Sequence, residues 1–130
     1  MKRILFLFVA IMVSTVSISA QKQYAEMKFD STEYDFGTFY KDVNKLSHTF
    51  TFTNTGTMPA IINKAVTTCG CTVATYTKEP VAPGKKGTVV IEYNPIGRFP
   101  GEFKRTITLM TNAKKQMCKL YIKGNMIERP

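Results

Sequence analysis

The residues in this sequence that are best suited to chemistry are two cysteines separated by one glycine, Cys69-Gly70-Cys71. Two thiols this close together can form a disulfide, supply two ligands to a soft metal ion, or pack as small apolar side chains. In an extended chain their Cα atoms would lie roughly 6.8 Å apart, at the limit of disulfide geometry. Glycine at the middle position can adopt dihedral angles that bring the thiols closer together. We therefore treat Cys69 and Cys71 as a candidate redox or disulfide pair.

A redox function for this pair needs an activated thiol, and a metal site needs more ligands. A helix N-terminus or a nearby cation activates a thiol; no helix is predicted here, and the nearest cations along the chain are Lys64 and Lys78. Zinc motifs usually place about two to four residues between their cysteines. The methionines show no Met-x-x-Met spacing of the kind that would suit copper(I). We predict no bound metal and no cofactor, and thiol-based redox or metal handling remains the alternative function.

The third cysteine, Cys118, is predicted to be a buried free thiol. It alternates in phase with Leu120 and Ile122, so it shares the apolar face of an extended segment. A buried cysteine usually behaves as a small, inert apolar residue. Three cysteines cannot all pair within one molecule, so at least one is left over. A disulfide between Cys118 and either Cys69 or Cys71 is the alternative.

The residues needed for common catalytic sites are scarce. His48 is the only histidine in the chain, and the alternation of its segment turns it inward together with Phe50. We expect it to pack in the core or at its rim, and not to act as a base or a metal ligand. The glycine-rich segment 83–87 lacks the following helix that a phosphate-binding loop requires. No catalytic, cofactor-binding or metal-binding residue is therefore predicted, and the chain is predicted not to be an enzyme.

The first 20 residues have the pattern of a signal peptide. Lys2 and Arg3 precede an uninterrupted apolar run over residues 4–13, and small or hydroxyl-bearing residues follow up to Ala20. This run suits the apolar part of a signal peptide and is much shorter than the roughly 20 residues that cross a bilayer. We expect cleavage after Ala20, with cleavage after Ser19 or an uncleaved anchor helix as the alternatives. The predicted product is exported to the periplasm or cell envelope, or secreted, without a stable membrane span.

Beyond this leader, apolar and polar residues alternate as expected for strands with one buried face. Residues 46–52 show the pattern most clearly, since every second residue is apolar or histidine and the others are serine or threonine. Pro83-Gly84 is typical of a type II turn, and Gly37 is interpreted as a bulge within a strand. Strands are predicted over residues 34–40, 46–53, 60–66, 72–76, 89–94, 103–110 and 117–123.

These seven short strands, without a helix, predict an all-β fold: a single seven-stranded antiparallel immunoglobulin-like β-sandwich after an N-terminal signal peptide. A small closed barrel is the main alternative. The antibody-type core of tryptophan packed on a disulfide is excluded because the chain has no tryptophan. We expect a signal peptide over residues 1–20, a linker over 21–28, the immunoglobulin-like domain over 29–125 and a tail over 126–130.

The basic composition gives little indication of a partner. Removal of Lys2 and Arg3 with the leader would lower the formal net charge from +9 to +7. The remaining basic residues are scattered, with adjacent pairs only at 85–86, 104–105 and 114–115. Without a basic run or stripe, nucleic acid is not an expected partner. We expect another envelope protein or surface component instead, and the sequence leaves the oligomeric state open.

An ordered set of short motifs resembles one known bacterial family. The motifs are Tyr34-Asp35-Phe36-Gly37-Thr38, the segment 48–56, Cys69-Gly70-Cys71-Thr72, Ala82-Pro83-Gly84, Gly101-Glu102-Phe103 and Thr111-Asn112. They cover nearly the whole mature chain and are similar to the family named domain of unknown function 1573, whose usual pattern lacks Cys118. The resemblance implies an immunoglobulin-like sandwich related to major-sperm-protein and ASH domains. It also implies exported or periplasmic placement and no established activity.

The sequence thus predicts an exported, non-enzymatic immunoglobulin-like module with an interaction or structural role in the cell envelope. Domains of this kind bind partners through an exposed sheet edge or through the loops at one end of the sandwich.

Overall fold

The computed structural model of the chain describes residues 23–130, and the expected signal peptide lies outside the described residues. Within that range the chain forms strands and turns, with no helix. The eight strands are β1 (Met27–Phe29), β2 (Glu33–Tyr40), β3 (Leu46–Asn54), β4 (Ile62–Thr67), β5 (Thr72–Tyr76), β6 (Lys86–Tyr93), β7 (Gly101–Thr111) and β8 (Met117–Ile127).

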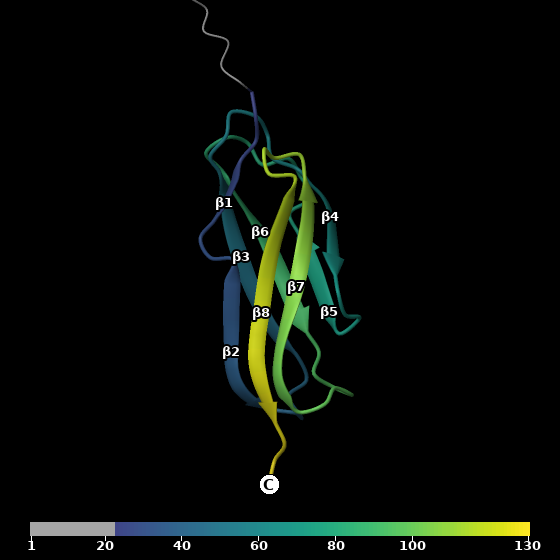
Figure 1. The fold of residues 1–130 in the computed structure, drawn as a ribbon. Helices are drawn as coiled ribbons and strands as arrows, with labels where there is room; N and C mark the ends of the chain where they lie inside the picture. Colours follow the sequence, from purple (N-terminus) through teal and green to yellow (C-terminus); the bar gives the residue numbers. More distant parts are fainter. Residues whose placement is uncertain (1–22) are drawn as a thin grey trace, which may run out of the picture.

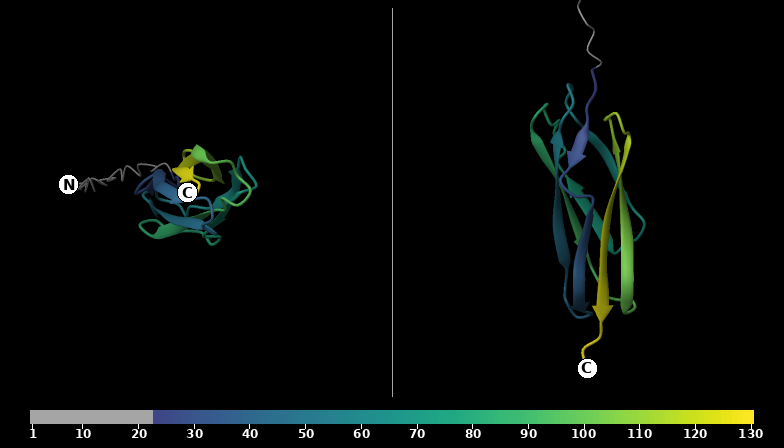
Figure 2. Two further views of the ribbon diagram at one scale, coloured as in Figure 1. Left: turned by 90° about the horizontal axis from the view of Figure 1, so that it is seen from below. Right: turned by 60° about the vertical axis from the view of Figure 1, so that its left-hand side comes forward.

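The strands form two four-stranded sheets that pack face to face (Figure 1). One sheet has the strand order β1-β3-β6-β5, and the other has the order β2-β8-β7-β4. Seen from below, the two sheets enclose one common interior (Figure 2, left). In the turned view, the strands run along the long axis of the sandwich (Figure 2, right). The expected all-β sandwich is therefore confirmed.

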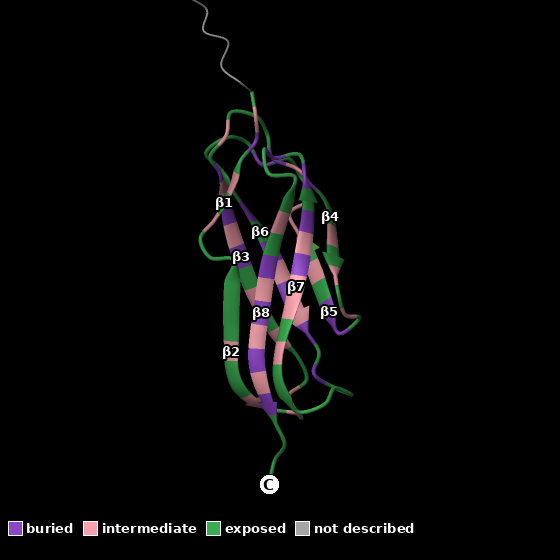
Figure 3. Ribbon diagram, viewed as in Figure 1, coloured by how far each residue is buried: buried purple, intermediate pink, exposed green. Residues whose placement is uncertain are grey.

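Alternation along the central strands builds the core between the sheets, as the alternating burial along β8 illustrates (Figure 3). Phe50 and Phe52 of β3 are 2% and 0% exposed, whereas the threonine between them is only partly buried. Ile91 of β6 packs with them from the same sheet, and Leu109 of β7 and Leu120 of β8 complete the interior from the other sheet. Burial of such side chains stabilises the fold by about 25 cal/mol per Å² of apolar surface.

Asn54, at the end of β3, is fully buried and organises the turns around it. Its Nδ2 donates to the carbonyl oxygens of Met58 at 2.6 Å and Val81 at 2.9 Å. Its Oδ1 accepts from the backbone N–H groups of Gly56 at 2.9 Å and Glu26 at 3.3 Å. A buried amide with both its donor and acceptor groups paired avoids the penalty of an unsatisfied polar group. One side chain thus ties the 55–59 turn to the start of the domain and to the segment before β6.

Two features of the N-terminal part differ from the prediction. The segment expected to be a linker contains β1, which pairs antiparallel with β3, and Ala25 is 2% exposed. In addition, β2 pairs parallel with β8, so the sandwich is not wholly antiparallel. Strands that are distant in sequence need no tight turn between them, which permits the parallel arrangement. At the other end β8 reaches Ile127, beyond the expected start of the tail.

The interruption predicted in β2 is present as a register shift between Asp35 and Thr38. Gly37 has a φ of 70°, and its N–H donates to the Asp35 carboxylate at 2.7 Å. Phe36 and Phe39, on either side of it, are both partly buried against the core.

Candidate functional site

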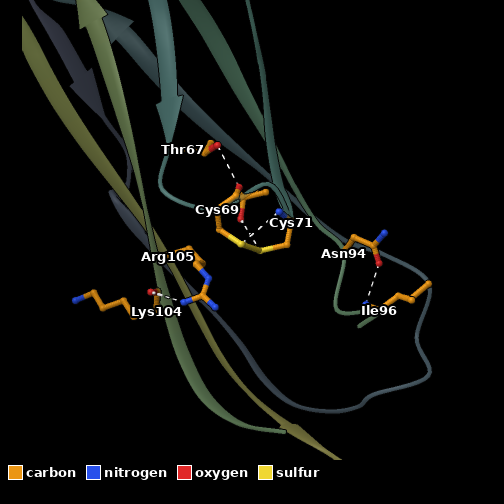
Figure 4. The surroundings of a disulfide bond; sticks show 8 residues. Thr67, Cys69, Cys71, Asn94, Ile96, Lys104 and Arg105 are labelled. Carbon is orange, nitrogen blue, oxygen red and sulfur yellow. Dashed lines mark hydrogen bonds between the residues drawn. A yellow bond between two sulfur atoms is a disulfide. The ribbon is translucent and has the colours of Figure 1, made fainter. Parts of the chain in front are cut away.

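Cys69 and Cys71 lie in the turn that carries the chain from β4 in one sheet to β5 in the other. The structure joins them by a disulfide, with their Cα atoms 5.2 Å apart (Figure 4). This is closer than the separation expected for an extended chain. Gly70, however, is not among the glycines with positive φ, and a Cβ at this position would meet no atom within 4 Å. The turn therefore forms without the conformational freedom that the sequence argument assigned to glycine.

Hydrogen-bond donors face both sulfur atoms of the pair. The backbone N–H of Cys71 donates to Cys69 Sγ at 3.3 Å, and the hydroxyl of Thr72 lies 3.7 Å from Cys71 Sγ. The turn itself is held by the Cys69 carbonyl, which accepts from the Thr72 N–H at 3.1 Å and the Thr67 hydroxyl at 3.3 Å. Cys71 is 7% exposed and Cys69 is half-buried, so Cys69 is the more accessible of the two.

Arg105 lies in the surroundings of this disulfide (Figure 4). It occupies β7 in phase with the buried Ile107 and Leu109, so its side chain leaves the strand on the core side. Its Nε is buried and has no hydrogen-bond partner among the described residues, and its Nη1 reaches the Lys104 carbonyl only at 3.5 Å. Because nearly all buried polar atoms are paired, an unpartnered guanidinium nitrogen calls for an explanation.

The cations considered from the sequence, Lys64 and Lys78, did not include Arg105. Lys64 is exposed on β4, and Lys78 lies with its Nζ 6.0 Å from the ring of Tyr76. The signal for Arg105 was nevertheless present, because a basic residue shares the phase of Ile107 and Leu109 along an otherwise apolar face.

Cys118 is a free thiol at the opposite end of the sandwich, near the start of β8. It is half-buried rather than fully buried and packs against the core. Its Sγ donates to the Lys115 carbonyl at 3.7 Å. Burial raises the pKa of this thiol, and the charge of Lys115 opposes the rise. The structure does not bring Cys118 together with Cys69 or Cys71.

His48 lies in an aromatic slot between the sheets. Its ring stacks on Tyr34 of β2 and meets Phe50 edge-on, with ring centroids 3.7 Å and 4.7 Å away. Partial burial lowers the pKa of His48 below its ordinary value of 6.5. Among residues 23–130, no group of three or more His, Cys, Asp or Glu side chains is placed to hold a metal ion.

The end of the sandwich at which β6 connects to β7 carries the most exposed aromatic side chain of the described region. Phe99 is 93% exposed and Ile96 is 61% exposed, both in the loop between β6 and β7. The Asn94 side chain shapes this loop by accepting the Ile96 N–H at 3.0 Å. A groove of 460 Å³ adjoins it, lined by Lys41, Asp42, Ile96, Gly97, Glu128 and Arg129. We call Ile96, Phe99 and this groove the loop-end surface.

The charged groups that border the loop-end surface are paired with one another. Arg129 Nε lies 2.6 Å from the Asp42 carboxylate, and Lys41 Nζ lies 3.6 Å from that of Glu128. The guanidinium of Arg129 also lies 4.3 Å from the centre of the Tyr40 ring. The surface therefore has an apolar centre and a rim of neutralised charge pairs.

No stretch of the described chain forms a helix with the length and apolar character needed to span a membrane.

Known proteins of similar structure share the fold at low sequence identity. A protein of unknown function from Porphyromonas gingivalis W83 matches with a TM-score of 0.68 and 17% identity, over 79% of this chain and 47% of that one. The ASH/PapD-like domain 7 of human CEP192 matches with a TM-score of 0.60 and 11% identity, over 88% of this chain and 94% of that one. The VesB protease of Vibrio cholerae matches with a TM-score of 0.58 and 13% identity, over 77% of this chain and 31% of that one.

The chain thus spans about half, or less, of the length of the Porphyromonas and Vibrio proteins. Identities this low establish the fold alone, and the fold they establish is the predicted immunoglobulin-like one.

Among curated proteins, none matches this sequence. A family model does match residues 27–126, and its description is protein of unknown function (DUF1573). The resemblance seen in the sequence motifs is therefore confirmed, and the chain belongs to the DUF1573 family.

Proposed function

We propose that this chain is an exported, non-enzymatic protein-interaction module of the cell envelope, and that it binds its partner through the loop-end surface. Export rests on the basic and apolar pattern of residues 1–20. The interaction role is supported by the immunoglobulin-like fold, which the ASH/PapD-like domain of human CEP192 shares. Because a fold does not determine function, the site carries the argument.

The observation that carries the proposal is the near-complete exposure of Phe99 beside the exposed Ile96. Single apolar residues on a surface are common, whereas an exposed apolar patch rimmed by polar residues marks an interaction site, and Ile96 also lines the groove. Protein interfaces combine an aromatic or aliphatic centre with a polar rim, which is the arrangement seen here. Since Lys41 and Arg129 are already paired with carboxylates, the surface favours a protein partner over an anionic membrane.

The absence of an enzymatic role is part of the same proposal. The single histidine of the chain stacks on Tyr34 and meets Phe50 edge-on, so its ring packs as an aromatic side chain. A general base needs access to its substrate and a pKa near the working pH. The stacked, partly buried His48 with its lowered pKa fits a packing role better.

Affinity capture from an envelope extract tests the proposal. The wild-type chain is compared with the double variant Ile96→Ser, Phe99→Ser and with Met117→Ser, which removes a 49% exposed apolar side chain at the opposite end. We expect a reproducible partner with the wild type and with Met117→Ser, and its loss with the double variant. A partner retained equally by all three chains would contradict the assignment of the loop-end surface, and no partner for any of them would contradict the interaction role.

A further inference from the structure

We propose that the Cys69–Cys71 disulfide is a thiol–disulfide exchange site, which accepts two electrons from a dithiol of another protein, with Arg105 as the counter-ion of the thiolate that is released. The disulfide lies near the loop that carries the loop-end surface, because the Asn94 N–H donates to the Cys71 carbonyl at 2.8 Å and Ile96 is among the residues around the pair (Figure 4). Thiol–disulfide exchange does not depend on the partner bound at that surface. It rests on the accessibility of one sulfur, the donors around both sulfurs and the presence of Arg105 in their surroundings (Figure 4). The Nε of Arg105 has no hydrogen-bond partner among the described residues, although its Nη1 donates to the Lys104 carbonyl and its guanidinium lies 5.9 Å from the centre of the Phe103 ring.

The two sulfurs differ in access, which assigns their roles. Cys71 is 7% exposed, whereas Cys69 is half-buried at the surface of the turn. An incoming thiolate must approach a sulfur atom directly, so it attacks Cys69 Sγ. Cys71 Sγ is then the leaving sulfur, and the hydroxyl of Thr72 is already 3.7 Å from it.

The reaction balances as two successive exchanges. A thiolate of the partner's dithiol forms a bond to Cys69 Sγ as the Cys69–Cys71 bond breaks, and the electron pair leaves on Cys71 Sγ. The partner's second thiol loses its proton to solvent and attacks the partner sulfur of this mixed disulfide, which releases Cys69 as a thiolate. The partner's dithiol is oxidised to a disulfide, and Cys69 and Cys71 are reduced and take up protons from solvent according to their pKa values.

One charged group in the surroundings of the pair favours the reduced state. A disulfide carries no charge, and with the disulfide formed the Nε of Arg105 has no hydrogen-bond partner among residues 23–130, although Nη1 donates to the Lys104 carbonyl at 3.5 Å. Reduction creates an anion in the surroundings of this guanidinium (Figure 4), and a nearby cation lowers the pKa of a thiol. The N–H of Cys71, which already donates to Cys69 Sγ at 3.3 Å, adds a donor to the second sulfur. Stabilising the reduced form makes a disulfide a stronger oxidant.

The test measures the redox equilibrium of the folded mature chain in a Cys118→Ala background, so that only the pair reacts. The protein is equilibrated in glutathione buffers of graded ratio, and with dithiothreitol as a small dithiol. It is then alkylated, and the labels are counted by intact mass. The variants are Arg105→Met, Arg105→Lys and, as the matched control, Lys104→Met. Lys104 is the adjacent residue on the outer face of β7, with its Nζ 4.7 Å from the Tyr121 ring.

We expect dithiothreitol to reduce the pair fully without unfolding and the pair to equilibrate with glutathione. Arg105→Met is expected to change the equilibrium constant for exchange with glutathione about tenfold, in favour of the Cys69–Cys71 disulfide. The reason is that loss of a neighbouring cation raises a thiol pKa by about one unit. Arg105→Lys keeps the charge and is expected to stay within about threefold of the starting protein. Lys104→Met is expected to change the constant by less than about twofold, since exposed charges act through water.

A second measurement keeps the proposal falsifiable if Arg105→Met fails to fold. The rate at which the reduced pair is alkylated as a function of pH gives its apparent pKa without any substitution at Arg105. A value well below the roughly 8.5 of free cysteine supports the proposal. A value at or above it overturns the proposal, and so do equal shifts in Arg105→Met and Lys104→Met or a pair that dithiothreitol cannot reduce in the folded chain.

Discussion

His48 of β3 stacks face to face on Tyr34 of β2, with the ring centroids 3.7 Å apart and the planes 8° from parallel. These strands belong to different sheets, so the pair joins the two layers where no backbone hydrogen bonds connect them. Tyr34 also meets Phe36 edge-on at 5.1 Å, and His48 meets Phe50 in the same way. The two edge-to-face contacts are of the kind that contributes about 0.5–1.5 kcal/mol per pair beyond the area buried.

The pH dependence of stability is expected to report on His48. Because partial burial lowers its pKa below 6.5, the unfolded chain takes up this proton first as the pH falls. The stability that neutral His48 contributes is therefore complete above about pH 6.5 and is lost as the pH falls toward the folded pKa. The variant His48→Phe keeps an aromatic ring and removes the titration, so its stability should fall less between pH 7.5 and pH 5.

Denaturant unfolding of both proteins over this range checks the prediction. Glu33, whose pKa is lowered mainly by its hydrogen bond to Lys123, loses its contribution only at lower pH, below its ordinary value of 4.5. Parallel pH profiles for wild type and His48→Phe would contradict the assigned role of His48.

Removal of the Asn54 side chain is expected to be the most damaging polar substitution in the domain. Asn54→Ala leaves the Met58 carbonyl and the N–H of Gly56 without their side-chain partner, whereas the Val81 carbonyl keeps the N–H of Ala60. Unsatisfied groups of this kind cost about 1–3 kcal/mol each, so we expect a loss of about 3 kcal/mol in the free energy of unfolding. Asn63→Ala, at an exposed position of β4, is the matched control and should change it by less than about 0.5 kcal/mol. Similar losses in both variants, measured by urea unfolding, would contradict the account.

Two glycine-to-alanine substitutions should differ in their effect on the stability of the fold. Gly87 is buried opposite Phe52 in the β3–β6 register, and a Cβ at Gly87 would overlap the Phe52 ring. Overpacking a core costs about 1–3 kcal/mol, so Gly87→Ala should destabilise by about 2 kcal/mol. Gly70→Ala meets no atom and needs no positive φ, so it should leave both the stability and the Cys69–Cys71 disulfide unchanged. Thermal unfolding measures the stability of both variants, and thiol counting measures the disulfide in Gly70→Ala. Loss of the disulfide in Gly70→Ala would show that the turn does require glycine.

Much of the fold could be predicted because half-buried strands leave a two-residue period in the sequence. The period over residues 46–52 correctly gave β3 and the inward side of Phe50 and Phe52. The short strand β1 was missed because Met27–Phe29 contains too few residues to show a period. The parallel pairing of β2 with β8 was also missed, since alternation shows which face of a strand is buried and not which strand lies beside it.

The candidate site was harder to predict because it depends on contacts between distant segments. The cysteine spacing identified the pair, but not the turn that brings their Cα atoms to 5.2 Å without a special glycine conformation. The inward phase of Arg105 is visible in the sequence, whereas its neighbourhood with the disulfide appears only when β7 packs beside the turn after β4. The exposure of Phe99 has no sequence signal, because a loop lacks the alternation that shows which side of a strand is buried.

Site-specific photocrosslinking shows whether the loop-end surface binds a partner. A photoreactive phenylalanine analogue replaces Phe99 in one chain and Met117 in another, in cells that produce the protein. Both positions expose apolar side chains, at opposite ends of the sandwich. We expect one discrete adduct from position 99, none from position 117, and loss of the adduct when Ile96→Ser is added. The same products from both positions, or no product from position 99, would contradict it.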